Sequence, residues 1–422
     1  MFQIRINTAA NSQSVFILYY EELIVRSLSK YQQIINLNPG SKVQDFRVNV
    51  RVIEQQGITF TGASDYVGIT RQSSNEVIYS YTPTLADQSD TTYGLARDMM
   101  VEYDVNHPST GAGLIIVNDC YFAQFFSPSG VEPVPVDIVF VIDVSGSMSG
   151  NKIAQTREAL ETIINQLRVS DRFTMVTFES NVDTWRDRLV SASEYRQQGI
   201  QFARGLMADG GTNFYGGLER GINILKSYGN PNYVQLLVML TDGEPTVGET
   251  NSDTIVSLAV SALINTRISV NCLGFGQNLK FLLLQRLALS NNGIARRIYE
   301  DSDAAQQLEG FFEEISSPIL HTISINYPQN TVQNISNTVF PLLFNGSELV
   351  IAGKFTDDAC SSQELVNVEV VAFGASTSPV RFTTQVDAGG NTMIGDQTPL
   401  TERLVAYLTI QQLLDQKKIA GT

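Results

Sequence analysis

The side chains of this sequence best suited to chemistry are oxygen donors gathered in short segments. The first segment is Asp143-Val144-Ser145-Gly146-Ser147, which follows an apolar run and precedes a helical pattern. Carboxylate and hydroxyl oxygens are hard ligands, which suit Mg²⁺ or Ca²⁺ better than zinc. Taken alone the pentapeptide is a weak signal, because Asp and Ser are also common in turns and at helix starts.

Two further segments carry donors of the same kind. Gly210-Gly211-Thr212-Asn213 opens a predicted helix, and Leu240-Thr241-Asp242-Gly243 ends an apolar run. Ligands of open α/β sheets bind outside the carboxyl ends of the strands, so we expect the three segments to converge. The sequence therefore predicts a site for Mg²⁺, or for Ca²⁺ or Mn²⁺, formed by Asp143, Ser145, Ser147, Thr212 and Asp242. Glu244 and Asn213 either shape the rim of this site or are ordinary loop residues.

The elements that would position these segments alternate between strands and helices from residue 134 to residue 317. Unbroken apolar runs predict strands buried on both faces, and apolar residues three or four apart predict the helices that cover them. The expected strands are 136–143, 173–178, 234–240, 268–275 and 297–299. The expected helices are 151–167, 194–207, 214–228, 253–263, 279–289 and 303–315.

Both flanks of this α/β unit alternate with period two, which predicts β structure. Upstream, 46–52 is such a strand, a helical turn is expected only around 20–28, and 127–135 is a linker rich in Pro, Gly and Ser. Downstream, the expected strands are 321–327, 348–355, 366–373 and 380–386, followed by a helix over 401–416 with an entry signal at Pro399 and Thr401.

These patterns predict an α/β plus all-β fold with a doubly wound, mostly parallel sheet. We expect the α/β domain, residues 134–317, to be inserted in or flanked by one β-sandwich, with residues 36–133 as its first part and 318–398 as its second. Residues 1–35 form a further β segment, and 399–422 form a C-terminal helix.

Charge and hydropathy exclude several classes of partner. A net charge of −15 opposes electrostatic binding of nucleic acid and of other polyanions, which normally needs a basic patch. The longest apolar runs fall short of the roughly 20 residues of a membrane helix, so no membrane partner is expected.

The cysteines and the N-x-[ST] triplets are relevant to whether the protein is secreted or intracellular. Cys120 and Cys272 lie in apolar, strand-like runs and are expected to be buried, inert thiols, whereas Cys360 is expected to be exposed. Three cysteines allow at most one internal disulfide. The first residues do not have the pattern of a secretory signal. Asn334 and Asn345 begin N-x-[ST] triplets, which become glycosylation sites only in a secreted chain.

The three donor segments together resemble the metal-ion-dependent adhesion site, or MIDAS, of von Willebrand factor A domains. Longer matches resemble more specifically the inter-alpha-trypsin inhibitor heavy chains. The matching segments are 140–148, 240–250, 272–276, 295–303 and 406–414. By this resemblance, Asp143, Ser145, Ser147, Thr212 and Asp242 are the metal ligands.

The resemblance implies a secreted glycoprotein of plasma or extracellular matrix. Its expected partners are hyaluronan-matrix proteins or a Kunitz-type chain in a serine protease inhibitor complex. Family members begin with a signal peptide and a full VIT domain, and only the later part of that domain is recognisable here, around 19–23. The C-terminal processing site of several members is also missing. We therefore expect a chain truncated at both ends, without covalent transfer to hyaluronan.

Rival functions fit less well. Aspartyl-phosphate chemistry would need a second Asp where Ser145 stands, and no nucleotide-binding P-loop is present. His107 and His321 fall in the β flanks, so no enzyme is expected. The remaining alternative is an intracellular scaffold that pairs VIT and von Willebrand factor A domains, as in the vault poly(ADP-ribose) polymerase. In either case the cation would bind an acidic protein ligand.

Overall fold

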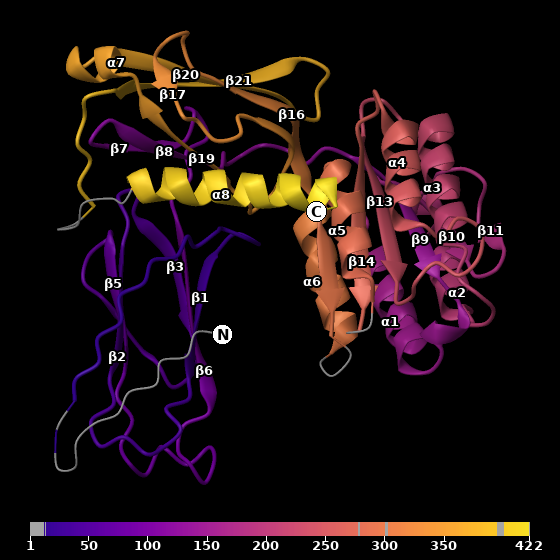
Figure 1. The fold of residues 1–422 in the computed structure, drawn as a ribbon, viewed down its shortest axis with the longest axis horizontal. Coiled ribbons are helices and arrows are strands. Elements are labelled where there is room, and N and C mark those ends of the chain that lie inside the picture. The colour runs from indigo at the N-terminus through magenta and orange to yellow at the C-terminus, as the bar shows by residue number, and fades with distance from the viewer. Residues whose placement is uncertain (1–11, 13, 277–278, 300–302, 395–400, 422) are drawn as a thin grey trace.

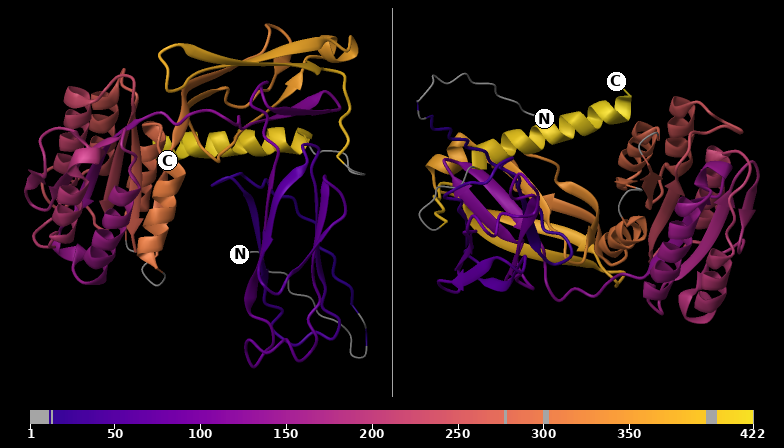
Figure 2. Two further views of the ribbon diagram at one scale, coloured as in Figure 1. Left: turned by 180° about the vertical axis from the view of Figure 1, so that it is seen from behind. Right: turned by 90° about the horizontal axis from the view of Figure 1, so that it is seen from below.

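The computed structural model describes residues 12, 14–276, 279–299, 303–394 and 401–421. Its parts are an α/β domain, at the right of Figure 1, and two separate groups of β strands stacked at the left. The long helix α8 (Thr401–Ala420) runs alongside the upper β group toward the α/β domain, and Figure 2 shows the same arrangement from behind and below. In the described residues, no helix is both long and apolar enough to cross a membrane.

The α/β domain is built on one twisted sheet. Its path runs in the order β11-β10-β9-β13-β14-β15, and β12 pairs with β10. Neighbours from β10 to β15 are parallel, whereas β11 and β12 pair antiparallel. The strands are β9 (Val136–Asp143), β10 (Arg172–Phe178), β11 (Val182–Thr184), β12 (Val190–Ser191), β13 (Val234–Thr241), β14 (Ile268–Phe275) and β15 (Ala295–Ile298).

Helices cover both faces of this sheet, as expected from its apolar strands. Every residue of β9 is buried. Ile138 and Phe140 belong to the core on one face, and Val139 and Val141 to the core on the other. The helices are η1 (Gly146–Met148), α1 (Asn151–Gln166), α2 (Ala192–Arg204), α3 (Phe214–Tyr228), α4 (Ser252–Leu263), α5 (Phe281–Ser290) and α6 (Ala304–Ile315). The predicted fold class is confirmed.

The first β group is a sandwich of two three-stranded sheets. One sheet has the order β1-β6-β3 and the other β2-β5-β4, with Val77, Tyr79 and Met99 buried between them. The strands are β1 (Tyr31–Leu37), β2 (Val48–Ile53), β3 (Ile58–Ala63), β4 (Gly68–Arg71), β5 (Glu76–Tyr81) and β6 (Arg97–Val105).

The helical turn expected around residues 20–28 is absent from this described segment, which has no regular secondary structure before the bridge between Ser27 and Lys30. Its Arg26 side chain reaches across to Asp104 at 2.8 Å and to the Ser127 hydroxyl at 3.0 Å. These tertiary bonds outweigh the weak local helical pattern.

The second β group joins strands from both sides of the α/β domain. Its sheets have the orders β18-β16-β20-β21 and β17-β19-β8-β7. The upstream strands are β7 (Leu114–Asn118) and β8 (Tyr121–Phe126). The downstream elements are β16 (Pro318–Asn326), β17 (Val332–Gln333), β18 (Val339–Phe344), β19 (Leu349–Phe355), α7 (Asp357–Ser361), β20 (Leu365–Phe373) and β21 (Pro379–Asp387).

The pairing of β8 with β19 means that the α/β domain is an insertion in this second sandwich. The grouping differs from the expectation that 36–133 is one part of a single sandwich. Among the described strands, those of residues 31–105 pair with one another, and of the upstream strands it is β7 and β8, within 114–126, that join the second sandwich. The pairing of β8 with β19 joins segments more than 200 residues apart in the chain. Local periodicity predicts that each segment is a strand, but it does not predict its partner.

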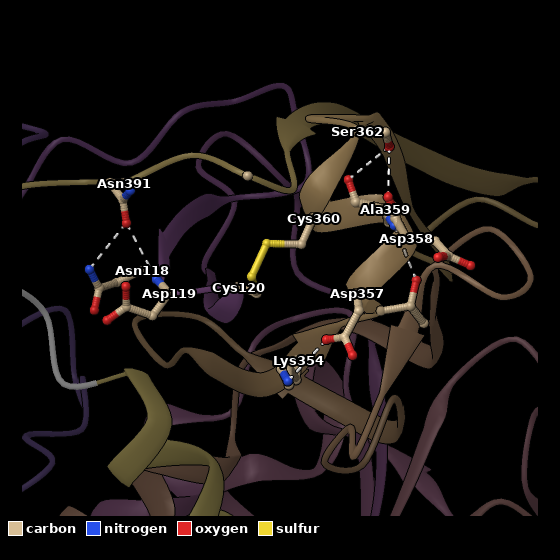
Figure 3. Close-up of a disulfide and its surroundings, with 12 residues drawn as sticks. Asn118, Asp119, Cys120, Lys354, Asp357, Asp358, Ala359, Cys360, Ser362 and Asn391 are labelled. Atoms are coloured by element: carbon tan, nitrogen blue, oxygen red, sulfur yellow. Dashed lines mark hydrogen bonds and ion pairs between the residues drawn. A yellow bond between two sulfur atoms is a disulfide. The ribbon is translucent and has the colours of Figure 1, made fainter.

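A disulfide fastens the two halves of the second sandwich (Figure 3). Cys120, next to β8, is bonded to Cys360 in α7, with Cα atoms 5.7 Å apart and 240 residues between them. Closing so long a loop removes on the order of 5 kcal/mol of entropy from the unfolded chain. Cys120 is therefore not a free thiol and Cys360 is only partly exposed, contrary to expectation, whereas Cys272 is free and buried as expected. The pairing follows from the tertiary approach of β8 and α7.

Two sequence features fall outside the described residues. Pro399 of the helix entry signal is one, and 300–302 of the segment 295–303 are the other.

Candidate cation site

The strand order places the two predicted carboxylates side by side. β9 is the first strand of the α/β domain, and the chain goes from it to β10 on one side and later returns to β13 on the other. The space between β9 and β13 is therefore the topological switch point of the sheet, where open α/β sheets bind ligands. Asp143 is the last residue of β9, and Asp242 directly follows β13.

Asp143 is fully buried and is held by neighbouring hydrogen bonds. The Ser145 backbone N–H donates to its Oδ1 at 2.8 Å, and the Thr241 hydroxyl donates to its Oδ2 at 2.6 Å. Burial raises the pKa of Asp143, hydrogen bonds from Ser145 and Thr241 oppose that rise, and the charge of Asp242 adds to it. The two carboxylates therefore repel each other, and a cation between them would relieve the repulsion.

The hydroxyl donors line up between these carboxylates. The Oγ atoms of Ser145 and Ser147 lie 3.0 Å apart, and the Ser147 hydroxyl donates to Asp242 Oδ1 at 2.7 Å. Ser145 is buried, whereas Ser147 is exposed. The Asp143-x-Ser145-x-Ser147 segment therefore bridges from the buried carboxylate to the surface.

Thr212 reaches the same place from the loop that precedes α3. Gly210 has a φ of +75°, which favours glycine, and its carbonyl accepts from the Gly146 N–H at 3.0 Å. A Cβ built on Gly243 would lie 3.4 Å from Thr212 Oγ1 and 3.5 Å from Ser147 Oγ. Thr212 is 4% exposed. All five predicted residues thus gather at one edge of the sheet.

Lys152 also enters this cluster, and the sequence reasoning did not foresee it. Its Nζ lies 2.6 Å from Asp242 Oδ2, and the Asp242 side chain is only 1% exposed. The ammonium therefore supplies positive charge to one of the two carboxylates. A lysine in the first turn of α1, five residues after Ser147, was the available signal, because that turn must pass the carboxyl edge of the sheet.

The residues considered for the rim have other partners. Asn213 is the N-cap of α3 and accepts from the Gly216 N–H at 3.2 Å. Glu244 forms an ion pair of 2.7 Å with Lys280, and both side chains are about half exposed. His107 pairs with Asp104, and His321 lies in β16, so both histidines are in the β sandwiches.

The donor set is oxygen throughout. Within the described ranges, no group of three or more His, Cys, Asp and Glu side chains is arranged to hold a metal ion. A cation here would rely on two carboxylates and three hydroxyls, which fits a hard ion such as Mg²⁺ and not zinc.

The α/β domain is similar to a known domain family and to solved structures. The profile described as "von Willebrand factor type A domain" matches residues 137–314. A solved structure, "von Willebrand factor type A from Catenulispora acidiphila", superposes with a TM-score of 0.54 at 17% identity, covering 72% of this chain and 76% of that one. This likeness concerns the fold.

Sequence relatives cover nearly the whole chain. Inter-alpha-trypsin inhibitor heavy chain H4 of Homo sapiens is 36% identical over 98% of this chain, and heavy chain H3 of Rattus norvegicus is 37% identical over 99%. The chain is a homologue of the inter-alpha-trypsin inhibitor heavy chains. It spans about half of the relatives' length, 46% of H4 and 49% of H3. In this heavy-chain homologue, the five predicted ligands all lie inside the von Willebrand factor type A domain.

Proposed function

We propose that this chain is a non-enzymatic adhesion protein that binds an acidic protein ligand through a divalent cation. Asp143, Ser145, Ser147, Thr212 and Asp242 would hold the ion, with Mg²⁺ first and Ca²⁺ or Mn²⁺ as alternatives. The observation that carries the proposal is the meeting of two nearly inaccessible carboxylates with three hydroxyls at the switch point of the sheet.

The arrangement suits binding better than catalysis. A bound cation would supply a coordination position for a carboxylate of the partner. Asp143 is fixed by hydrogen bonds from Ser145 and Thr241, and both histidines of the chain lie in the β sandwiches, away from the cluster. Ser145 and Thr241 position the carboxylate, and neither histidine stands beside it to act as a general acid or base.

The test is thermal unfolding of the wild-type chain and of Asp242→Ala, first with EDTA and then with Mg²⁺, Ca²⁺ or Mn²⁺. Because the cation binds the folded state alone, the wild-type melting temperature should rise with added ion. At 100 times the dissociation constant the gain is about 2.7 kcal/mol. Asp242→Ala should not respond to the ion.

Glu161→Ala is the matched control, because Glu161 lies on α1 and pairs with Arg204. It should keep the full cation response. A wild-type chain that shows no response, together with no bound ion in equilibrium dialysis, would overturn the proposal.

We also propose that the chain works outside the cell. Disulfides form and persist in oxidising compartments, and Cys120 is bonded to Cys360. Asn334 and Asn345 are both exposed, as glycan acceptors must be. Peptide mapping of protein from its native source, without reduction, should find the Cys120–Cys360 link and glycans at both asparagines. Free thiols and unmodified asparagines would favour the intracellular scaffold instead.

The partners proposed for the chain are hyaluronan-matrix proteins or a Kunitz-type inhibitor chain. The names of the relatives support this assignment, since each is an inter-alpha-trypsin inhibitor heavy chain. The net charge of −15 argues that a contact with a hyaluronan matrix runs through a protein and not through the polyanion itself.

A further inference from the structure

A second candidate site lies where the α/β domain meets the second sandwich. A cavity of about 250 Å³ opens there, at the amino ends of β13 and β14 and therefore opposite the cation site. One wall comes from the start of these strands, including Tyr233 and Arg267, and the other from β16 and β18, including His321 and Leu342. Ligand sites are commonly found at such domain junctions.

The charge of this junction is opposite to that of the chain. Two further cavities, of about 200 and 320 Å³, adjoin the first and share Arg267 with it, and Lys226 lines the larger of these two. None of the described lining residues of the three cavities is Asp or Glu, although the net charge of the chain is −15. Such a local excess of positive charge attracts anions.

Arg267 is free to bind an anion. Its guanidinium donates to the Pro231 carbonyl at 2.5 Å, and no carboxylate of the described residues pairs with it. The guanidinium of Arg172, by contrast, pairs with the buried Asp137 at 2.6 Å. An arginine left with a carbonyl retains several unused donors in a planar fork that matches an oxyanion.

His321 faces the same space from the second sandwich. Its ring stacks on Phe373 at 5.7 Å and lies 9% exposed, and its Nδ1 is 3.0 Å from the Thr322 hydroxyl. Thr322 has a φ of +52°, which is unusual for a β-branched residue and falls where the strand register shifts. With Nδ1 engaged, Nε2 has no hydrogen-bond partner among the described residues and remains open to a ligand.

The remaining wall is apolar. It consists of the edge strand β18, whose Val339 is 61% exposed and whose Leu342 packs against the core of the α/β domain. Tyr233 lines the cavity from the other side, and the Arg172 guanidinium lies over its ring at 5.4 Å from the centroid. The cavity therefore combines one cationic end with an apolar wall.

We propose that this junction cavity binds a small organic anion, such as a carboxylate or sulfonate carried on an apolar ring or chain. Arg267 holds the anionic group, and Tyr233 with Val339 and Leu342 of β18 contacts the apolar part. Because the contacts come from both domains, the ligand also fixes the α/β domain against the second sandwich.

The probe is anilinonaphthalene sulfonate, a fluorescent aromatic anion, compared with the uncharged N-phenylnaphthylamine. The wild-type chain should bind the sulfonate at one saturable site. Arg267→Gln should weaken binding of the sulfonate by about ten-fold or more, because it removes a charged hydrogen-bond donor to the anionic group. The same variant should leave the uncharged probe unaffected. Val339→Asp, which changes an exposed side chain, should weaken both probes.

Arg381→Gln is the control, because Arg381 lies on β21 and pairs with Glu369. It should change neither affinity. The melting temperature of each variant shows whether the chain is folded. The proposal is overturned if the wild type shows no saturable binding, if Arg267→Gln binds the sulfonate normally, or if it weakens both probes equally.

Discussion

At the residue scale, the main feature of the cation site is that two carboxylates of like charge lie close together. Asp143 is completely buried and the side chain of Asp242 is nearly so, and the negative charge of Asp242 adds to the rise in the pKa of Asp143. Hydroxyls of Ser147 and Thr241 donate to the carboxylates, but neutral donors do not cancel two charges. Lys152 supplies the one positive charge that the described contacts of Asp242 include.

This arrangement makes Lys152 a competitor of the cation. Lys152→Gln should lower stability in EDTA by about 1–3 kcal/mol, because Asp242 loses its charged partner. The same change should tighten cation binding, and a difference of 1.4 kcal/mol would correspond to about ten-fold. Isothermal titration with Mg²⁺ and melting in EDTA measure the two effects.

Lys280→Gln is the comparison for Lys152, since Lys280 pairs with Glu244 and both side chains are about half exposed. Exposed pairs contribute little, so this variant should behave like the wild type in both measurements. Unchanged Mg²⁺ affinity in Lys152→Gln would show that the lysine does not compete.

At the scale of the elements, helix α3 controls the loop that carries Thr212. The helix lies close to the sheet because Gly217 has no side chain: a Cβ there would lie 2.6 Å from Cδ1 of the buried Phe178. Phe178 in turn packs edge-on against Phe214, the first residue of α3. Any displacement of α3 therefore moves the loop at its amino end.

Gly217→Ala should destabilise the α/β domain by about 1–3 kcal/mol, because the added methyl overpacks a core that cannot yield. It should also weaken the response of the melting temperature to Mg²⁺, because Thr212 shifts with the helix. Gly310→Ala is the comparison, because a Cβ built on this residue of α6 has nothing within 4 Å and the added methyl therefore fits without strain. That variant should gain up to about 1 kcal/mol from helix propensity and keep the full response.

At the scale of the whole molecule, the two β sandwiches meet at a buried carboxyl group. The Tyr31 hydroxyl, from β1, donates to Glu348 Oε1 at 2.9 Å, just before β19. Burial raises the pKa of Glu348 to about 7, the charges of Glu54 and Asp104 add to the rise, and Tyr31 and Arg26 oppose it. The backbone of Ser29 also donates to the Gly346 carbonyl across the same junction.

The raised pKa predicts that the junction weakens as the pH rises. Below pH 4.5, the ordinary pKa of a glutamate, Glu348 is protonated in both the folded and the unfolded state and does not affect the free energy of unfolding. Between pH 4.5 and about 7, Glu348 is ionised in the unfolded chain and still protonated in the folded chain. The free energy of unfolding therefore falls by on the order of 3 kcal/mol by pH 7. Glu348→Gln keeps an acceptor for Tyr31 and should be more stable than the wild type at pH 8 and equal to it near pH 4.

Chemical denaturation at several pH values measures this difference. Glu369→Gln is the control, because Glu369 of β20 pairs with Arg381 of β21 and lies away from the junction of the two sandwiches. Its stability should follow the wild type across the range. A Glu348→Gln variant with the same pH dependence as the wild type would contradict the assignment.

Local sequence patterns were enough to place the α/β domain and its candidate ligands. Strands β9 and β13 are mainly apolar, with Asp143 as the last residue of β9 and Asp242 directly after β13, so the type of each strand and its carboxyl end can be recognised from neighbouring residues. Parallel strands joined by helices have one preferred handedness, which brings such ends to one edge. Asp143 and Asp242 could therefore be assigned to one site before any tertiary contact was known.

Which distant segments pair could be seen only in the folded chain. β7 and β8 join the downstream strands, and Cys120 meets Cys360, because segments far apart in the chain approach each other. Lys152 reaches Asp242 because of the path that its side chain takes. Period-two alternation shows which face of a strand is buried, but it does not show which other strand lies beside it: β1 and β20 both alternate and belong to different sandwiches. The choice of partner is made by packing and long-range hydrogen bonds, which have no local signature in the sequence.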